Sequence, residues 1–458
     1  MHDGAQDPLA LLRDAADAAT TYLTPLVAME TLRRRRMAAT LAGDEAAGRG
    51  VGATDAGGMN RLLHARKLLN HRARQITTPN ADTLYTDAWI DLRRGPARIA
   101  LPRHGDRYVS LALMDMWTNN FAVLGSRATG PDGGVFTLVG PEAGTEGLSG
   151  PVIRAPTPIV WALARILAAG PEDMDAARAV QDGMTLETAP SPENAAPDAA
   201  EGTRLAPWPE FFAQAERLMA LHRPPAMDTG VLRRIAPLGL GPEAGAEGPF
   251  DPDRFSAAEA AAIEEGVARA RARLKRAQGP RSWDGSKAKG AWQGPPAKLG
   301  DYGQDFFIRA SVAVGGLGAL PLEEATYFRA NAVAGERLDG RRPMRWRIPG
   351  DRPLPVAGFW SLSLYKPTPE GEFFFVENPI GRHAIGDRTP GLVRDPDGGV
   401  TIHLSHDDPG DARRANWLPA PAGPYDLVLR CYLPAKELLD GRHSPPEPEP
   451  ANMEETPK

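Results

Sequence analysis

The sequence predicts an α+β protein, mainly β, with two jelly-roll-like antiparallel β-sandwich domains and inserted and flanking helices. Glycine and proline account for 48 and 45 of the 458 residues, which is typical of a chain with many turns. Two regions, 88–139 and 344–432, contain short β-rich runs separated by Gly, Pro and Asp. The region between them has longer segments with the apolar spacing of helices.

The chain exceeds the size of one ordinary hydrophobic core, so we divide it into five parts. These are an N-terminal helix and Gly-rich loop (1–60), a first β-sandwich domain (61–187), a variable loop and helical insertion (188–300), a second β-sandwich domain (301–446) and a disordered tail (447–458).

The first elements are helical. Asp7 and Pro8 are typical of a helix start, and apolar residues recur at three- or four-residue spacing as far as Leu32. The four arginines at 33–36 end this helix, where cations suit the helix dipole. A further short helix is predicted at 62–72.

Successive strands are predicted after this helix. They are 88–92, 97–101, 108–115, 121–124 and 135–139, and a helix is predicted next at 157–169. Two amphipathic helices follow at 208–222 and from Ser256 to about 277, the latter with Glu259 as the capping partner of Ser256.

The second region starts with a helix at 309–317, which 323–334 is expected to extend. Its predicted strands are 344–348, 356–365, 373–376, 401–404 and 425–432. Residues 107–115 and 358–365 share an aromatic-Ser-Leu strand pattern, and an Asn and an Arg follow each of them. We therefore hypothesise that the two regions are related sandwiches that pack together, with the matched residues Asn119 and Asn378, and Arg127 and Arg382, near the contact between them. Chance similarity between two strands is the alternative.

Composition excludes several functional classes. A net charge of −5 over this length gives no field that would attract nucleic acid or an anionic membrane. No apolar run approaches the length of about 18 residues that a membrane span needs, and no secretory signal is visible. We therefore expect a cytoplasmic protein with no nucleic-acid and no membrane partner, and we leave a homo-oligomer open.

The sequence predicts no cofactor and no metal site. It lacks the common nucleotide-binding, hydrolase and zinc-protease motifs. Cys431 is the sole cysteine and lies in a strand-like run, so we expect a buried inert thiol. His403 and His406 are three apart on a predicted strand and would face opposite sides, so a shared metal would require a break between them.

Polar side chains gather in the stretch 78–85, more densely than a turn requires. Asp82 and Asp115 are candidates for a general acid and base, Tyr85 for a proton donor and Arg127 for an anion clamp. The candidate ligand-binding residues are Asn80, Thr83, Trp117, Asn119, Trp360, Tyr365, Asn378, Arg382, Asn416 and Trp417. An Asx turn, ordinary core tryptophans and a buried structural Asp–Arg pair are the alternative interpretations.

Four spaced motifs carry a resemblance to a known family. They are the stretch 78–85, the segment 115–127, the strand 359–365, and the segment 416–421 together with Arg430 and Tyr432. With these motifs the chain resembles the bacterial two-domain family built from domain of unknown function 1254 followed by domain of unknown function 1214. The resemblance implies β-sandwich, jelly-roll-like domains with inserted helices and assigns no activity.

Together these observations predict a cofactor-independent enzyme of the hydrolase or lyase type. It would act on a small polar or sugar-like molecule in a cleft between the two sandwiches. A carboxyl group with a shifted pKa in a closed site would favour this prediction. The alternative is a non-catalytic small-molecule or carbohydrate-binding protein, and a structural protein would be indicated if the candidate residues proved buried and mutually satisfied.

Overall fold

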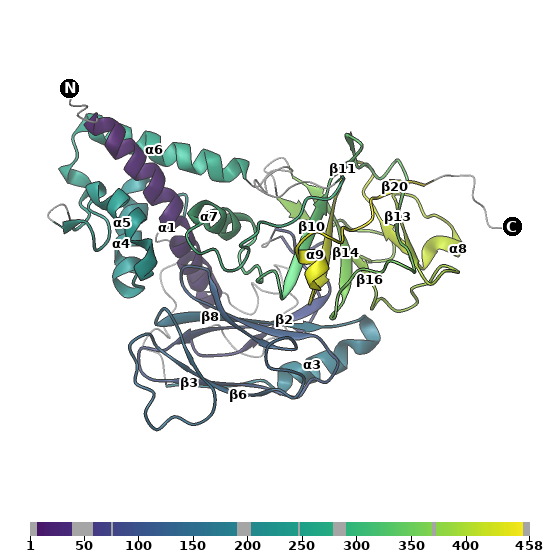
Figure 1. Cartoon of the computed structure of the whole chain (residues 1–458). Coiled ribbons are helices and arrows are strands. Elements are labelled where there is room, and N and C mark those ends of the chain that lie inside the picture. The colour runs from purple at the N-terminus through teal and green to yellow at the C-terminus, as the bar shows by residue number, and fades with distance from the viewer. Residues whose placement is uncertain are drawn as a thin grey trace.

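The computed structural model describes residues 7–38, 58–74, 77–189, 203–245, 248–277, 290–368 and 372–451. Two β-sandwiches and a group of helices make up this structure (Figure 1). The first sandwich lies at the bottom of Figure 1, the second at the right and the helices at the upper left. The predicted α+β class, with two sandwiches and inserted helices, is confirmed.

The first sandwich packs two sheets face to face. One sheet has the spatial order β1 (Leu63–His64), β2 (Thr83–Asp91), β8 (Ile159–Leu167), β4 (Val109–Met114) and β5 (Asn120–Gly125). The other has the order β7 (Val152–Arg154), β6 (Gly134–Val139), β3 (Ala97–Leu101) and β9 (Thr185–Glu187). Leu84 and Ile90 from β2 meet Ile99 from β3 and Leu138 from β6 in one buried core, because alternate strand residues share a face.

The second sandwich has a similar construction. Its first sheet runs β10 (Ala325–Ala330), β19 (Asp426–Tyr432), β14 (Trp360–Pro367) and β15 (Phe373–Phe374), and β16 (Ala384–Gly386) also pairs with β14. Its other sheet runs β18 (Trp417–Pro419), β17 (Val400–Ser405), β13 (Met344–Ile348) and β20 (Glu449–Pro450). A short hairpin joins β11 (Ala332–Val333) to β12 (Glu336–Arg337).

The two sandwiches have the same strand order. The central sheet order β2-β8-β4-β5 corresponds to β10-β19-β14-β16, and the outer order β7-β6-β3 corresponds to β18-β17-β13. Even the exceptions to antiparallel pairing agree, since β6 pairs with β7 and β17 with β18 in parallel. The prediction that the two regions are related sandwiches is therefore confirmed by their topology. The predicted place of the matched residues is wrong for Asn378 and Arg382, which bond within their own sandwich, whereas Arg127 reaches Glu324 of the second domain.

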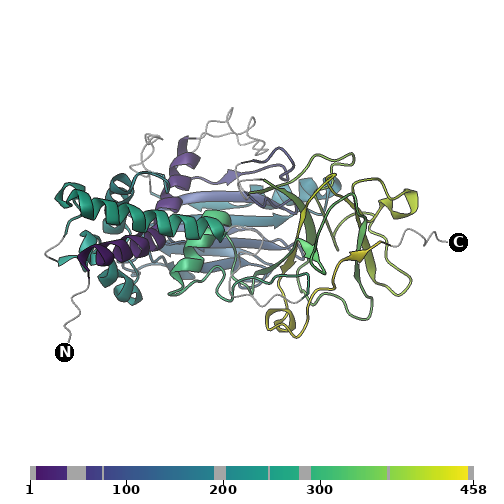
Figure 2. The ribbon, with the colours of Figure 1, turned by 90° about the horizontal axis from the view of Figure 1, so that it is seen from above.

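The remaining elements are helices. They are α1 (Pro8–Ala38), α3 (Met174–Asp182), α4 (Trp208–Leu221), α5 (Thr229–Ile235), α6 (Ala257–Arg276), α7 (Phe306–Gly315), α8 (Asp411–Arg414) and α9 (Lys436–Leu439). Figure 2 shows α1 and α6 side by side above the first sandwich. The capping box predicted for α6 is present, with the Ser256 hydroxyl accepting from the Glu259 backbone and Glu259 accepting from the Ser256 backbone. Leu23 and Leu26 of α1 share a core with Trp89 and Trp161 of the first sheet, so the helices cover part of the face that the second sandwich leaves free.

Three of the predicted helices are wrong. Residues 157–169 form β8, in which every residue is buried, so the run shows no alternation and could not be told from a buried helix by its pattern. Residues 62–72 contain β1, which pairs with β2, and 323–334 contain β10, which pairs along its whole length with β19. In all three segments the partner strand, which lies far away in sequence, decides the conformation.

The predicted disorder of the tail is wrong for its first residues. Glu449–Pro450 forms β20 beside β13, and the Pro446 carbonyl accepts hydrogen bonds from the indole N–H groups of Trp292 and Trp346, at 2.6 and 2.8 Å. The rest of the tail lies outside the described residues. So do most of the Gly-rich loop, the variable loop at 190–202 and the boundary segment at 278–289.

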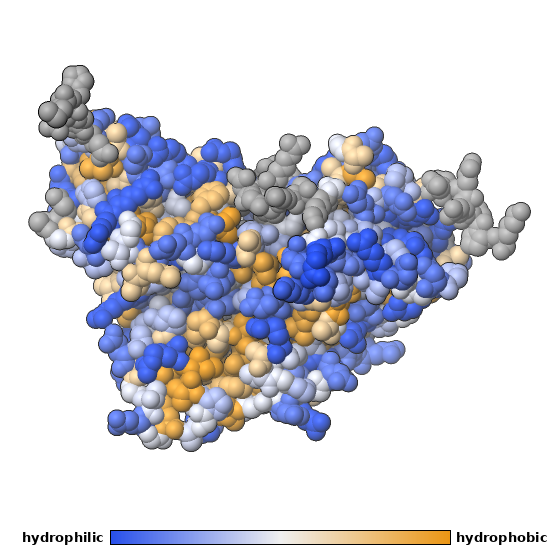
Figure 3. Space-filling model, viewed as in Figure 1, coloured by the Kyte–Doolittle hydropathy of each residue, from blue (hydrophilic) through white to orange (hydrophobic). Residues whose placement is uncertain are grey.

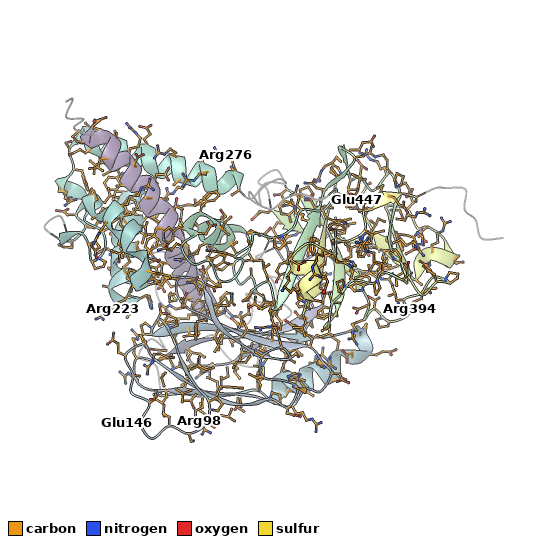
Figure 4. The ribbon with its side chains drawn as sticks, in the orientation of Figure 1. Arg98, Glu146, Arg223, Arg276, Arg394 and Glu447 are labelled. Atoms are coloured by element: carbon orange, nitrogen blue, oxygen red, sulfur yellow. The ribbon has the colours of Figure 1, made fainter. Side chains whose placement is uncertain are left out.

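Charged side chains at the periphery, such as Arg98 and Arg223, point away from the body of the protein (Figure 4). The face seen in Figure 3 is largely hydrophilic, with apolar residues gathered over the first sandwich and toward the second. Among the described helices, none combines the length and the apolar character that crossing a membrane requires.

Candidate functional site

The central sheets of the two sandwiches present equivalent rows of polar residues to each other. In the first sandwich Tyr85 on β2 pairs with Arg165 on β8, which pairs with Ser110 on β4. Residues directly opposite each other on antiparallel strands share a face, so these three side chains form one row.

The second sandwich repeats this row with the same residue types. Tyr327 on β10 pairs with Arg430 on β19, which pairs with Ser361 on β14. The Tyr432 ring of the second sandwich lies 5.0 Å from the Tyr108 ring of the first, so the two faces meet. We call the region between the two Tyr-Arg-Ser rows the joint.

Strand alternation explains how the second sandwich supplies its row. On β14, Trp360, Leu362 and Leu364 point into the core of the second sandwich. Ser361 and Tyr365 therefore lie on the opposite face and make hydrogen bonds to Asp82 and to the Pro79 carbonyl of the first domain. This alternation was readable in the sequence, but the location of the polar face against the stretch 78–85 was not.

The stretch 78–85 enters the joint at the start of β2. Asn80 is buried, and its side-chain amide donates to the Tyr432 hydroxyl at 2.9 Å and to the Thr83 hydroxyl at 3.2 Å. The Asn80 side-chain oxygen accepts from the Asp82 backbone N–H at 2.6 Å, which forms the predicted Asx turn. Asn80 and Thr83 therefore shape the turn and fix it to β19.

Arg430 holds the same turn through its guanidinium group. It donates to the carbonyls of Thr78 and Pro79, at 3.1 and 3.4 Å, and to the Ser363 hydroxyl at 2.9 Å. The Pro79 carbonyl also accepts from the Tyr365 hydroxyl at 2.5 Å. Thr78 has a φ of 57°, an uncommon backbone conformation for a β-branched residue, and these contacts hold it there.

Asp82 has one satisfied and one free carboxyl oxygen. Its Oδ1 accepts from the Ser361 hydroxyl at 2.7 Å, whereas its buried Oδ2 has no hydrogen-bond partner in the described part of the chain. Burial raises the pKa of Asp82 above its ordinary value, and the positive charge of Arg430 and the Ser361 hydroxyl only partly oppose this shift. A free carboxyl oxygen with a raised pKa is suited to exchanging a proton.

Glu324 occupies the position equivalent to Asp82, three residues before the tyrosine of its row. Both of its carboxyl oxygens are satisfied by the first domain: Oε1 accepts from the Tyr108 hydroxyl at 2.9 Å and Oε2 from Arg127 Nε at 2.7 Å. Burial raises the pKa of Glu324, against the effect of these two hydrogen bonds. Glu324 is therefore a structural link across the joint. Its ion pair with Arg127 uses the residue that was predicted to clamp an anion.

Arg165 is the counterpart of Arg430 and keeps a free donor. It is 7% exposed, its Nη2 donates to the Gly318 carbonyl at 2.7 Å, and its buried Nη1 has no hydrogen-bond partner in the described part of the chain. Its guanidinium carbon lies 5.5 Å from the centre of the Tyr85 ring, within cation–π range. The joint thus contains a fixed guanidinium group with one unused N–H direction.

Asp115, Trp117 and Asn119 lie apart from the joint, in a turn beneath the helices. The Asp115 carboxylate accepts from the backbone N–H groups of Trp117 and Asn119, both at 2.9 Å, and from the Asn119 side chain at 3.3 Å. The Trp117 indole donates to the His222 carbonyl at 3.2 Å, and its ring packs on Tyr22. Their predicted place in a shared cleft is not found, because the turn uses the Asp115 carboxylate and His222 the Trp117 indole, whereas Asn119 Oδ1 is buried without a partner among the described residues.

The other candidates of the second domain are also engaged inside their own sandwich. Trp360 packs edge-on against Trp346 in the core. Asn378 closes a loop through the Arg382 backbone. Arg382 donates to the carbonyls of Ala415 and Trp417.

Asn416 and Trp417 are engaged in the same way. Asn416 bonds to the backbone of Val393 and Thr401, and the Trp417 indole donates to the Ser405 carbonyl. The structure does not bring these residues to the joint.

Sequence reasoning missed Arg165, Glu324 and Tyr327 as site residues. The internal similarity could have found them in the register that the structure gives. Ser110 pairs with Gly125 and Ser361 with Gly386, so the equivalent segments are 125–130 and 386–391, which share a Gly-x-Arg-x-x-Gly pattern. The sequence alignment instead matched Arg127 with Arg382, which lies in an extra segment between β14 and β16.

The described residues contain no group of three or more His, Cys, Asp and Glu side chains arranged to hold a metal ion. The His406 ring lies 3.1 Å from the Ala420 carbonyl, a contact within its own sandwich. Cys431 is fully buried in the core of the second sandwich, and burial raises the pKa of its thiol far above the usual range.

Two family models match the chain. A model described as protein of unknown function (DUF1254) matches residues 59–188, and one described as protein of unknown function (DUF1214) matches residues 323–436. These ranges contain the two polar rows of the joint, and the helical insertion falls between them. No curated protein matches the chain.

The fold also occurs in solved structures. A crystal structure of a protein from Vibrio parahaemolyticus is 22% identical, and the alignment covers 96% of this chain and 100% of that one with a TM-score of 0.66. An uncharacterised protein from Burkholderia cenocepacia is 13% identical, with 96% and 93% of the two chains covered and a TM-score of 0.43. The first likeness extends the two-sandwich fold with its helices to a distant relative.

Proposed function

We propose that the function of this chain, which belongs to the two-domain family of unknown function 1254 and 1214, resides at the joint, because its two domains meet there. We propose a cofactor-independent enzyme of the hydrolase or lyase type that acts on a small polar or sugar-like molecule. The observation that carries this proposal is the carboxyl group of Asp82, which is buried, has a raised pKa and keeps Oδ2 unpartnered within the described residues.

The duplication explains why Asp82, and not Glu324, would carry the chemistry. A buried carboxyl group that serves only structure is expected to have its oxygens satisfied, as Glu324 does through Tyr108 and Arg127. Asp82 has the equivalent position but keeps one oxygen free at a cost in stability. Such a cost is typical of a group that a substrate completes.

The proposed mechanism uses Asp82 as the general base and acid. The Ser361 hydroxyl fixes Oδ1, so Oδ2 is held in one direction. In a hydrolysis Oδ2 would accept a proton from the attacking water and return it to the leaving group. In an elimination it would accept the proton from the substrate carbon and deliver it to the departing oxygen as the carbon–carbon double bond forms. Tyr85, three residues further along the chain, would anchor a substrate hydroxyl beside the guanidinium group of Arg165.

Replacing the Asp82 carboxyl tests this proposal. A thermal-shift screen of sugars, hydroxy acids and small amides would first identify ligands of the wild-type protein, and NMR would follow their conversion. Asp82→Asn keeps the size and one acceptor for Ser361, so we expect it to fold and to lose turnover by about 100-fold or more, because general base catalysis typically contributes that much. The proposal fails if Asp82→Asn turns the ligand over at the wild-type rate.

Asp115→Asn is the matched control. Burial raises the pKa of Asp115 as well, to about 6, but the turn satisfies its carboxylate with hydrogen bonds. We expect this variant to retain turnover.

The alternative function, a binding protein without chemistry, is favoured by the unused Arg165 N–H, which needs only a ligand. It predicts that a ligand stabilises the protein, that Asp82→Asn changes only its affinity and that no product forms.

A further inference from the structure

The two arginines of the joint have unequal surroundings. Arg430 directs its donors at the Thr78 and Pro79 carbonyls and the Ser363 hydroxyl. Arg165 is bonded to the Gly318 carbonyl alone, and its Nη1 is buried without a partner in the described part of the chain. The equivalent positions of the two rows therefore differ in their hydrogen bonds. Arg165 keeps a free donor, and Ser110 Oγ has no partner among the described residues, whereas Ser361 donates to Asp82.

The charges around Arg165 are also unbalanced. Arg127 is paired with Glu324, the carboxyl group whose charge also acts on Arg165, and Asp82 is the carboxyl group beside Arg430. Within the described residues Arg165 forms no salt bridge, and the tyrosines 85, 108, 327 and 432 surround it. Buried charges are normally paired, so an unpaired guanidinium group in this position indicates an anion that binds from outside.

We propose that the ligand of the joint is a small hydroxylated or sugar-like carboxylic acid whose carboxylate binds Arg165 Nη1. This inference rests on the proposed function and specifies its substrate class. A carboxylate would complete the buried donor with a charge-assisted hydrogen bond. Since Nη2 is fixed on Gly318, the guanidinium plane is already oriented, which limits the ordering that binding requires. The hydroxyl-bearing part of the ligand would then extend along the row toward Tyr85 and Asp82.

Matched pairs of acids and neutral analogues test this inference. The probes are D-galacturonate with D-galactose, D-glucuronate with D-glucose and gluconate with sorbitol, and inorganic phosphate is a further anion. Binding is measured by saturation-transfer NMR on the full chain. We expect at least one acid to bind about tenfold or more tightly than its neutral partner, because that partner leaves the buried N–H unpaired.

Variants of Arg165 locate the contact. Arg165→Gln should reduce the affinity for the acid about tenfold or more and leave the neutral analogue unchanged, so that the preference for the acid disappears. Arg165→Lys keeps the charge but cannot bond to Gly318 and the ligand in the same plane. The affinity of this variant for the acid should lie between those of the wild type and Arg165→Gln. Arg98→Gln, at an exposed arginine on β3, is the control and should bind as the wild type does. Near-UV circular dichroism verifies that each variant is folded.

Several outcomes overturn the inference. They are equal binding of acids and neutral analogues, binding of phosphate in preference to every carboxylate, an acid preference that survives in Arg165→Gln, and no binding of any acid. The proposed function is tested separately by Asp82→Asn. If neutral sugars bind and Asp82→Asn abolishes their turnover, the carboxylate inference is wrong and the proposed function stands.

Discussion

Two carboxyl groups that look alike in the sequence have different hydrogen-bond partners in the structure. Asp82 and Asp115 each stand beside a strand end with asparagine neighbours, and burial raises the pKa of both. Asp115 receives three hydrogen bonds from its own turn, whereas Asp82 receives one, from a serine 279 residues away in sequence. The number of bonds, rather than the pKa, separates the structural carboxylate from the candidate base.

At Asp115 the raised pKa makes stability depend on pH. A pKa of about 6 in the folded protein, against an ordinary value of 3.8, means that the folded state favours the protonated form. This contribution to stability is present below about pH 4 and is lost as the pH rises through 6. It amounts to ~3 kcal/mol. We therefore expect urea unfolding to show wild-type stability falling relative to Asp115→Asn between pH 4 and pH 7.

The control for this measurement is Asp132→Asn, which removes an exposed carboxyl group on the loop before β6. Its stability difference from the wild type should stay nearly constant over the same pH range. If the stability difference between Asp115→Asn and the wild type is also constant, the pKa of Asp115 is not raised in the folded protein. Arg309 of α7 and Tyr22 of α1 act on the charge of Asp115, and both residues are the same in the two proteins compared.

At the scale of elements, the helices depend on one close contact between α1 and α6. Gly266 of α6 lies against α1 so closely that an added Cβ would be 2.2 Å from the Arg13 carbonyl oxygen and 2.9 Å from the Ala16 side chain. These are backbone and Cβ atoms and cannot rotate away. The two helices can therefore lie side by side, as Figure 2 shows, only with glycine at this position.

Gly266→Ala should destabilise the protein by ~1–3 kcal/mol or more, because overpacking forces the helices apart. Gly230→Ala in α5 is a matched helical substitution where an added Cβ meets nothing within 4 Å. It should leave stability unchanged or raise it by ~0.5–1 kcal/mol, since alanine is the better helix former. Equal melting temperatures for the two variants, measured by circular dichroism, would contradict the proposed contact.

At the scale of the whole molecule, Glu324 links the two sandwiches. It is 1% exposed, and it joins Tyr108 and Arg127 of the first domain to the start of β10. The stacked rings of Phe359 and Tyr432, 4.1 Å apart, extend this contact with Tyr108. Through these residues the joint becomes continuous with the helical core, so we expect the halves to unfold together.

Removing this link should weaken that cooperativity. Glu324→Ala leaves Tyr108 and Arg127 without their acceptor, and we expect a loss of ~3 kcal/mol together with a broader urea transition that separates into two steps. Glu323→Ala, at the exposed neighbouring residue, should change stability by less than ~0.5 kcal/mol and keep one transition. If Glu324→Ala unfolds like Glu323→Ala, the carboxylate does not hold the sandwiches together.

The elements with a local residue pattern could be predicted from the sequence. Strands such as Ala97–Leu101 and Met344–Ile348 show the alternation of a half-buried strand, and the capping box of α6 is a four-residue motif. The polar stretch 78–85 and the similarity of the two halves were also visible, because both consist of residues that are near one another in the chain. The two-sandwich architecture followed from these patterns.

Which polar residues meet depends on how the two sandwiches pack. Arg165 lies in a run that is buried on both faces, so its pattern predicted a helix and its partner remained hidden. Asp82 and Ser361 form their bond across two sheets, whereas Asp115 bonds to its own turn and Arg382 to the carbonyls of Ala415 and Trp417 in its own sandwich. A sequence records which groups can bond, but burial and distance, which the packing of the sandwiches determines, select the groups at the joint, among them Asp82 Oδ2 and Arg165 Nη1, that have no partner in the described part of the chain.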